Sequence, residues 1–372
     1  MTTPFNPTYC LSNALNVVTV DPVNESEPSY VTTLRIEDIG ASPVKTIAIL
    51  KQTPNAANKV IFDLSEVLRV TSPTLVDHGI DFQFSTESVK RLRLTTTEVW
   101  DGGTNQIATA EGYVIHGAQQ FNEGLLYDNV GTNDTFLVHL KNIKATPDDI
   151  GVVGVQLPSS GGVQEAVIKV YDSANDLLDT FEVPLGLVSA NPTTRVQFIA
   201  LYPVNLEAIQ LLPSNWSYYT AQVDTDILRV DRACDLPYKK HRLAFVNNKG
   251  GWEYFNFDLN YSETIEIERQ EFTRLFGTWN AATFGYSFQE RGRAVFDATQ
   301  IERLTISAKV TSEQSRALKF LLASREVQLI NEDNTVEPVI VTDTSFPIFH
   351  DMDRSAKTLT VRIEKAHNIK VA

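Results

Sequence analysis

The residue types that could bind a metal ion or act in catalysis are spread along this 372-residue chain. The closest approach to a metal-binding cluster is His350 with Asp351 and Asp353, since a zinc ion needs three or four convergent ligands. The six histidines lie in different segments, and none is two or four residues from another. We interpret the segment around His350 as a solvated loop and expect no bound metal ion.

Carboxylate pairs give no stronger signal. Asp224 with Asp226, and Asp148 with Asp149, lack the spaced carboxylates and the glycine turn of a calcium loop. Two carboxylates could converge in space for glycoside hydrolysis, but 46 acidic residues supply candidates without selecting a pair. The sequence also lacks a nucleophile elbow, a phosphate-binding loop and a dinucleotide fingerprint. We therefore predict a protein without catalytic activity and without a cofactor.

Charge and composition limit the possible partners. The net charge of −14 argues against a nucleic-acid surface. No apolar run reaches the ~18 residues that a membrane helix needs, and the N-terminal segment lacks the basic and apolar regions of a secretory signal. Cys10 and Cys234 are far apart and form neither a metal motif nor a disulfide framework. We expect folding in a reducing cytosol, without direct nucleic-acid binding or membrane insertion.

The elements that must position these residues are mainly strands. Short β-prone segments recur with turn signals every ~8–12 residues, which is typical of β-sandwiches and barrels. Residues 91–95 show the pattern, with Leu92 and Leu94 expected to point inward between outward arginines. Further strands are expected at residues 208–212, 264–269, 294–296 and 301–310, and turns at 101–104 and 172–176. We predict an all-β protein of tandem β-sandwich or barrel-like domains. The predicted domains are an N-terminal β domain at 1–112, a central β-sandwich at 113–219 and a C-terminal β domain at 220–372.

One short α-helix is predicted in the C-terminal domain, over residues 311–324. Thr311 and Gln314 have the spacing of a capping box. An apolar stripe with helical spacing follows them. This stripe consists of Ala317, Leu318, Leu321 and Leu322.

The segment 241–260 is predicted to form a hairpin. Residues 241–246 alternate as a strand does, and residues 252–257 resume an aromatic, strand-forming pattern. The connection at 247–251 is rich in Asn and Gly, which reach positive φ at little steric cost.

Aromatic side chains cluster in and near this hairpin. Exposed aromatic platforms bind sugars or protein partners, whereas buried aromatic residues fill sandwich cores. We interpret these side chains as core or subunit-interface residues. The interface candidates are Trp252, Tyr254, Trp216, Tyr218 and Tyr219.

The hairpin sequence LAFVNNKGGWEYFNF (243–257) resembles a segment of virion proteins of tailed bacteriophages, including crAss-like phages and others that infect Bacteroidetes-type hosts. The helix-and-strand order from Leu318 to Asn368 is also similar to theirs, as is the strand–helix element from Val60 to Leu68. Asn248 stands where these proteins have Arg, and Glu253 where they have Asp or Tyr.

The resemblance implies a structural component of the virion, assembled in the host cytoplasm. Its place would be the tail or tail tip, as a baseplate or ring protein. Copies of the chain would form a ring or fibre and contact other virion proteins.

Two alternatives remain open at the level of sequence. A β-sandwich adhesin for host surface glycan would show an exposed aromatic row in a groove. A tail-associated glycan depolymerase would show two carboxylates about 5–9.5 Å apart in a cleft.

Overall fold

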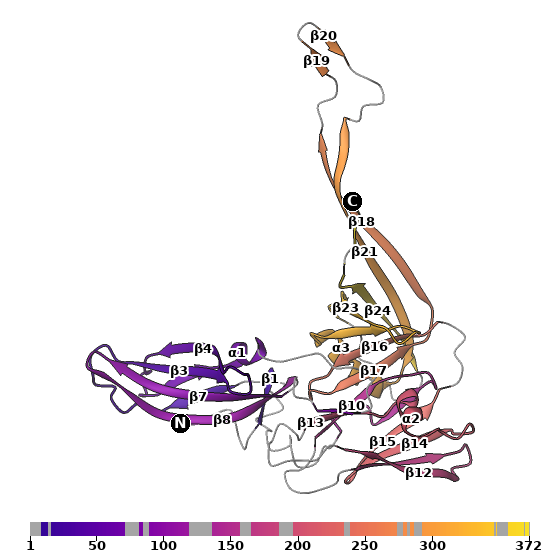
Figure 1. Cartoon of the computed structure of the whole chain (residues 1–372), viewed down its shortest axis with the longest axis horizontal. Helices are drawn as coiled ribbons and strands as arrows, with labels where there is room; N and C mark the ends of the chain where they lie inside the picture. Colours follow the sequence, from indigo (N-terminus) through magenta and orange to yellow (C-terminus); the bar gives the residue numbers. More distant parts are fainter. Residues whose placement is uncertain are drawn as a thin grey trace. The chain divides into compact units, whose positions relative to one another are not determined.

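The computed structural model is built mainly from β-sheets (Figure 1). Strand accounts for 58% of it and helix for 9%, so the predicted all-β class is confirmed. The structure describes residues 9–13, 16–70, 82–84, 89–118, 136–156, 165–185, 196–233, 239–273, 278–280, 283–285, 292–345, 347, 356–367 and 369–371.

The chain forms two compact units. The first unit comprises Met1–Asp235 with Phe245–Tyr254, and the second comprises Leu236–Ala244 with Phe255–Ala372. The boundary predicted between residues 112 and 113 falls inside strand β8, and the one predicted between 219 and 220 falls inside strand β14.

The N-terminal part of the first unit contains a five-stranded sheet in the order β1-β8-β7-β3-β4. Strands β7 and β8 form a hairpin through the predicted turn at Asp101-Gly102. A separate antiparallel pair joins β2 to β5. The bounds are β1 Tyr9–Asn13, β2 Val17–Val20, β3 Val31–Asp38, β4 Lys45–Gln52, β5 Val60–Asp63, β7 Val89–Trp100 and β8 Gly103–Ala118.

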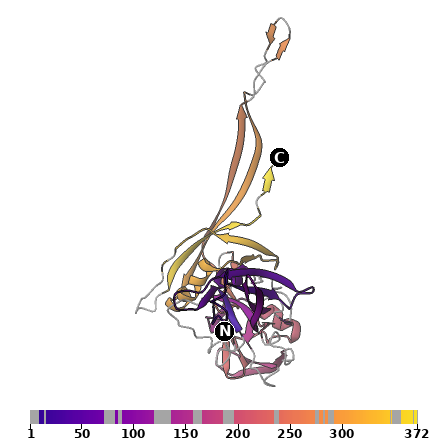
Figure 2. The same cartoon turned by 90° about the vertical axis from the view of Figure 1, so that its left-hand side faces the viewer.

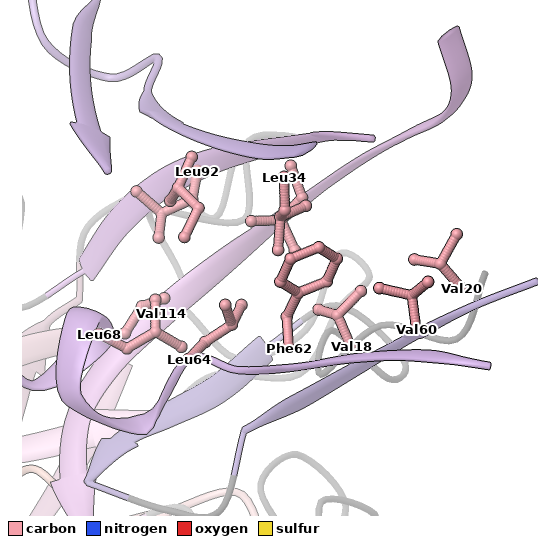
Figure 3. Close-up of a cluster of buried hydrophobic side chains, with 11 residues drawn as sticks. Val18, Val20, Leu34, Val60, Phe62, Leu64, Leu68, Leu92 and Val114 are labelled. Carbon is pink, nitrogen blue, oxygen red and sulfur yellow. The ribbon is translucent and has the colours of Figure 1, made fainter. Parts of the chain in front are cut away.

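A small sandwich core lies between these two sheets (Figure 3). Inward positions alternate along each strand, because successive side chains of a strand point to opposite faces. Leu92 and Leu94 are buried as expected, in the same cluster as Phe62 from the two-stranded pair. Helix α1 (Ser65–Val70) adds Leu68 to the same cluster.

The central part of the first unit contains two further sheets. One has the order β10-β13-β6 and the other the order β12-β11-β14-β15-β9. Asp172 builds the predicted connection between β11 and β12, since its Oδ1 accepts hydrogen bonds from the backbone N–H groups of Ala174 (2.8 Å) and Asp176 (2.9 Å). The bounds are β6 Phe82–Phe84, β9 Asn142–Ala145, β10 Val152–Gln156, β11 Glu165–Tyr171, β12 Leu177–Pro184, β13 Val196–Ala200, β14 Tyr218–Val223 and β15 Asp226–Arg232.

Helix α2 (Pro203–Ile209) replaces part of a strand that the sequence predicted at 208–212. Proline is well placed in a first helical turn, where its missing N–H needs no partner. Asn205 then fixes the helix to the core, because its Oδ1 accepts a hydrogen bond of 2.9 Å from the backbone N–H of Gly151.

The C-terminal sheet has the order β17-β16-β22-β23-β24-β21-β18, and β25 pairs with β21. The predicted hairpin forms from β16 and β17, whose outer residues 245–254 belong to the first unit. The bounds are β16 His241–Val246, β17 Trp252–Phe257, β18 Tyr261–Thr273, β19 Thr278–Asn280, β20 Thr283–Gly285, β21 Arg293–Val310, β22 Val327–Ile330, β23 Val336–Val341, β24 Lys357–Lys365 and β25 Ile369–Val371.

Helix α3 (Ser312–Ala323) confirms the helix predicted at 311–324. Both hydrogen bonds of the capping box are present: the Gln314 N–H donates to Thr311 Oγ1 at 3.2 Å, and the Thr311 N–H donates to Gln314 Oε1 at 2.9 Å. Leu318 and Leu321 of the predicted stripe are buried.

Strands β18 and β21 continue past the other long strands of their sheet as a ribbon, which we call the arm (Figures 1 and 2). The arm consists of residues 265–273 of β18 and 293–302 of β21, paired antiparallel. All thirteen residues of β18 are exposed.

Candidate functional site

The segment predicted to come closest to a metal cluster, His350 with Asp351 and Asp353, lies outside the described residues. Among the residues that the structure describes, no group of three or more His, Cys, Asp and Glu side chains could hold a metal ion. No helix in the described ranges is long and apolar enough to cross a membrane.

One aspartate of each pair considered as calcium ligands has a structural partner. Asp226 forms an ion pair of 2.6 Å with Lys141 and accepts a hydrogen bond of 2.9 Å from the Phe136 N–H. Asp149 closes a turn by accepting a hydrogen bond of 2.9 Å from the Thr146 N–H. Their carboxylates are therefore used in local hydrogen bonds.

Four of the five aromatic interface candidates are buried within their own chain. The hydroxyl of Tyr254 accepts a hydrogen bond of 3.0 Å from the Val152 N–H, and that of Tyr219 donates one of 2.6 Å to the Leu201 carbonyl. Their burial assigns these four side chains to the core of the first unit rather than to its surface. The four are Trp252, Tyr254, Trp216 and Tyr219.

Tyr218 is the candidate whose side chain is partly exposed. Its ring stacks on that of Tyr171, with 4.8 Å between the ring centroids and 12° between the planes. The guanidinium carbon of Arg229 lies 3.7 Å from the centroid of the same ring. Because Tyr171 and Arg229 come from strands on opposite sides of β14, the ring is held between them and offers no open face for stacking with a sugar.

The turn of the predicted hairpin is built by Asn247. Its Oδ1 accepts hydrogen bonds from the N–H groups of Lys249 (2.8 Å) and Gly251 (3.1 Å), and its Nδ2 donates one of 2.8 Å to the Leu137 carbonyl. Gly250 has a φ of 84°, a value that favours glycine. The Asn/Gly-rich sequence therefore closes the turn and also fixes it to the segment at 136–140.

Gly251 is needed for a different reason. A Cβ at this position would overlap the Leu137 carbonyl oxygen and lie 2.9 Å from Leu137 Cβ. The glycine therefore allows two backbone segments to approach closely.

Glu253 follows this turn in β17 and is 4% exposed. Its Oε1 accepts hydrogen bonds from the backbone N–H groups of His139 and Leu140, the second at 3.3 Å. Its Oε2 has no hydrogen-bond partner in the described part of the chain. Burial raises the pKa of this carboxyl to about 7, although the bonds from His139 and Leu140 and the charge of Lys249 favour the ionised form.

A carboxyl with this pKa is suited to proton transfer, which requires contact with a substrate. The burial of Glu253 and its bonds to His139 and Leu140 instead indicate that it fixes the hairpin to residues 139–140.

Glu98 is a second buried carboxylate, and both of its oxygens accept hydrogen bonds. Oε1 accepts hydrogen bonds from the Val23 N–H (2.6 Å) and the Tyr30 hydroxyl (2.7 Å), and Oε2 accepts one from Asn24 Nδ2 (2.7 Å). Burial alone would raise the pKa of Glu98, but these bonds outweigh it and lower the pKa. Burial, with the nearby charge of Glu98, also raises the pKa of Tyr30 to about 12. Glu98 therefore holds residues 23–30 against the sheet.

The arm is the clearest surface for binding a partner. Large apolar side chains on it are between 44% and 63% exposed, although the arm carries many charges. Exposed apolar groups of this kind mark interaction sites when they lie together. These side chains are Ile265, Ile267, Phe272, Val295 and Phe296.

The geometry of the arm supports the same interpretation. A two-stranded ribbon is at best marginally stable in water without a further layer. Strand β18 ends the sheet order, so the outer edge of the arm presents backbone N–H and C=O groups that no described strand pairs. Both the side chains and the backbone of the arm are therefore available to another strand.

Comparisons with models of known protein families and with curated protein sequences find no match for this chain. The resemblance to virion proteins of tailed phages therefore rests on the sequence segments that carry it, and its functional implication stays a prediction.

Proposed function

We propose that this protein is a non-enzymatic structural component of a bacteriophage virion, a tail or tail-tip protein of the baseplate or ring type. Copies of the chain self-assemble and contact other virion proteins. The proposal unites the sequence resemblance of the hairpin at 243–257 with a fold made of rigid β-sheets.

The arm is the observation that carries the proposal. Its exposed apolar side chains, and the strand edge that no described strand pairs, are stabilised most when a neighbouring chain covers them. Structural proteins that assemble from repeated subunits need such surfaces.

The buried carboxylates support a structural role in the same way. Glu98 holds residues 23–30, and Glu253 holds residues 139–140. Each is explained by the segment that it fixes, without a substrate.

Electron microscopy of the purified protein tests the proposal. We expect closed rings or fibres of regular repeat. Separate particles of single-chain size at every concentration would contradict it.

A parallel screen on host capsule and envelope polysaccharides separates the alternatives. We expect neither binding nor release of oligosaccharides. Binding without release would favour the adhesin, and release of oligosaccharides would favour the depolymerase.

A further inference from the structure

We infer that the arm is a self-association surface, in which the outer edge of β18 pairs antiparallel with β18 of a second copy about a twofold axis at Gln270. Arg269 of each copy then lies opposite Glu271 of the other. This inference rests on the proposed self-assembly and names the surface that performs it.

The outer edge of β18 is suited to strand addition. The strand pairs with β21 from Tyr261 to Thr273, and its other edge meets no described strand. A second copy on that edge would turn the two-stranded arm into a four-stranded sheet, and sheets of three or more strands with an apolar face are stable where two-stranded ones are marginal. Backbone hydrogen bonds give such pairing its affinity, and side chains give its register.

Charge selects the register. In a twofold antiparallel pair, residues at equal distances on either side of the axis lie opposite each other, and like charges there are destabilising. An axis at any charged residue of β18 places that residue opposite its own copy. An axis at Ile267 places Glu266 opposite Glu268.

An axis at Gln270 avoids these contacts. It places Arg269 opposite Glu271 twice, once on each side of the axis, and puts no like charges opposite each other over residues 267–273. Axes at Thr264 or Ile265 bring no opposite charges together. The sequence of the strand thus favours the register at Gln270.

A twofold axis of this kind also places the exposed aromatic side chains of both copies on one face. The rings of Phe272 and Phe296 contact each other within one copy, with centroids 6.1 Å apart. A twofold axis perpendicular to the sheet keeps each face on the same side in both copies. The aromatic pair of one copy and that of the other therefore lie on one face of the four-stranded sheet.

Charge reversal tests the pairing in the full-length protein, by analytical ultracentrifugation. Arg269→Glu and Glu271→Arg should each raise the dissociation constant of self-association by about tenfold, because each creates two like-charge contacts between the copies. Glu271→Arg also removes the ion pair of Glu271 with Arg293 within the chain, but both side chains are exposed, so this loss should contribute little. The double variant restores opposite charges with their positions exchanged, and it should return close to the wild-type value.

Glu263→Arg is the matched control, since it makes the same charge change on an exposed residue of β18 outside the paired segment. It should leave the dissociation constant within about twofold of wild type, as expected for an exposed charge without an opposite partner. Melting curves of all variants report whether each one folds.

Disulfide trapping tests the axis itself. Residues directly opposite in an antiparallel pair have Cα atoms about 4.5–5.5 Å apart, within the range of a disulfide. Gln270→Cys should therefore form a covalent dimer on mild oxidation. Glu268→Cys should not, because its copy lies about 14 Å away along the strand.

The outcomes separate this inference from the proposed function. Loss of association in both single variants, its recovery in the double variant and cross-linking at Gln270 support the inference. An assembly that is insensitive to both charge reversals, or that is not cross-linked through Gln270→Cys, overturns the inference and leaves the proposed function standing. A wild-type protein that stays a single chain overturns both.

Discussion

Glu253 combines a nearly complete burial with an oxygen that has no partner among the described residues. Its neighbours on the strand, Trp252 and Tyr254, are also buried, so both faces of this part of β17 are covered. A charged carboxylate in such a site is costly unless hydrogen bonds compensate, and here the bonds from His139 and Leu140 compensate only one oxygen.

We predict that Glu253→Gln removes the part of the pH dependence of stability that arises from this carboxyl. The carboxyl has an ordinary pKa of 4.5 when unfolded and about 7 when folded, so the folded state binds the extra proton. In the wild type, this group makes stability fall as pH rises from 4.5 to about 7, by about 3 kcal/mol in total. The glutamine variant should lose this decline and be the more stable protein at pH 8.

Denaturant unfolding at pH 5 and pH 8 measures the effect. Glu207→Gln is the control, because it makes the same substitution at an exposed residue of the same unit. An equal pH dependence in wild type and Glu253→Gln would show that the carboxyl is not buried as described.

Trp252 and Phe255 should differ strongly when each is truncated to alanine. Trp252 is 2% exposed, whereas Phe255 is only half-buried. Trp252, which was expected at an interface, is therefore a core residue. Trp252→Ala should lower the free energy of unfolding by about 3–5 kcal/mol, and Phe255→Ala by clearly less. Thermal melting of the two variants ranks them, and a larger loss for Phe255→Ala would contradict the assignment of Trp252 to the core.

At the scale of elements, α3 depends on local sequence for its start. Its N-cap, Thr311, accepts a hydrogen bond from the Gln314 N–H. Thr311→Ala should cost about 1 kcal/mol of stability, whereas Thr311→Ser keeps the hydroxyl and should cost little. Chemical denaturation compares the two variants, and equal stabilities would mean that the cap contributes nothing.

Local signals of this kind predicted most of the elements. The capping box predicted α3, the alternation at Leu92 and Leu94 predicted β7, and the Asn/Gly segment predicted the hairpin turn. Helix α2 was missed because apolar residues near 208–212 also suit a strand, although Pro203 at the start of the helix was a usable signal.

The burial of two carboxylates, Glu98 and Glu253, was not predicted from the sequence. Glu98 lies on the same inward face of β7 as Leu92 and Leu94. The alternation of inward and outward residues along the strand could therefore have identified it as buried. Glu253 could be placed only with residues 139–140, more than one hundred residues away, and no local pattern contains that contact.

The arm shows a further limit. The sequence predicted short strands at 264–269, 294–296 and 301–310, but the structure joins the last two into β21. Alternation between apolar and charged residues in β18 predicts one buried face, whereas both faces are exposed in the chain. The pattern is explained if a partner buries the apolar face.

At the scale of the whole molecule, the division into units depends on a chain path that composition does not reveal. The chain leaves the second unit after Ala244 and returns to it at Phe255. A boundary inside a hairpin has no linker, so the Pro and Gly signals used to divide the sequence could not locate it.

The net charge of −14 also bears on assembly. Like-charged chains repel each other at long range, and salt screens that repulsion. The proposed association therefore depends on local contacts, such as those of the strand edge and the apolar side chains of the arm.

The mass of the purified wild-type protein in solution, measured by sedimentation over a range of concentrations, tests the central claim most directly. A structural protein that self-assembles should sediment as a defined multiple of the 41.5 kDa chain, with a mass that rises with concentration. A constant mass of 41.5 kDa at every concentration would contradict the account.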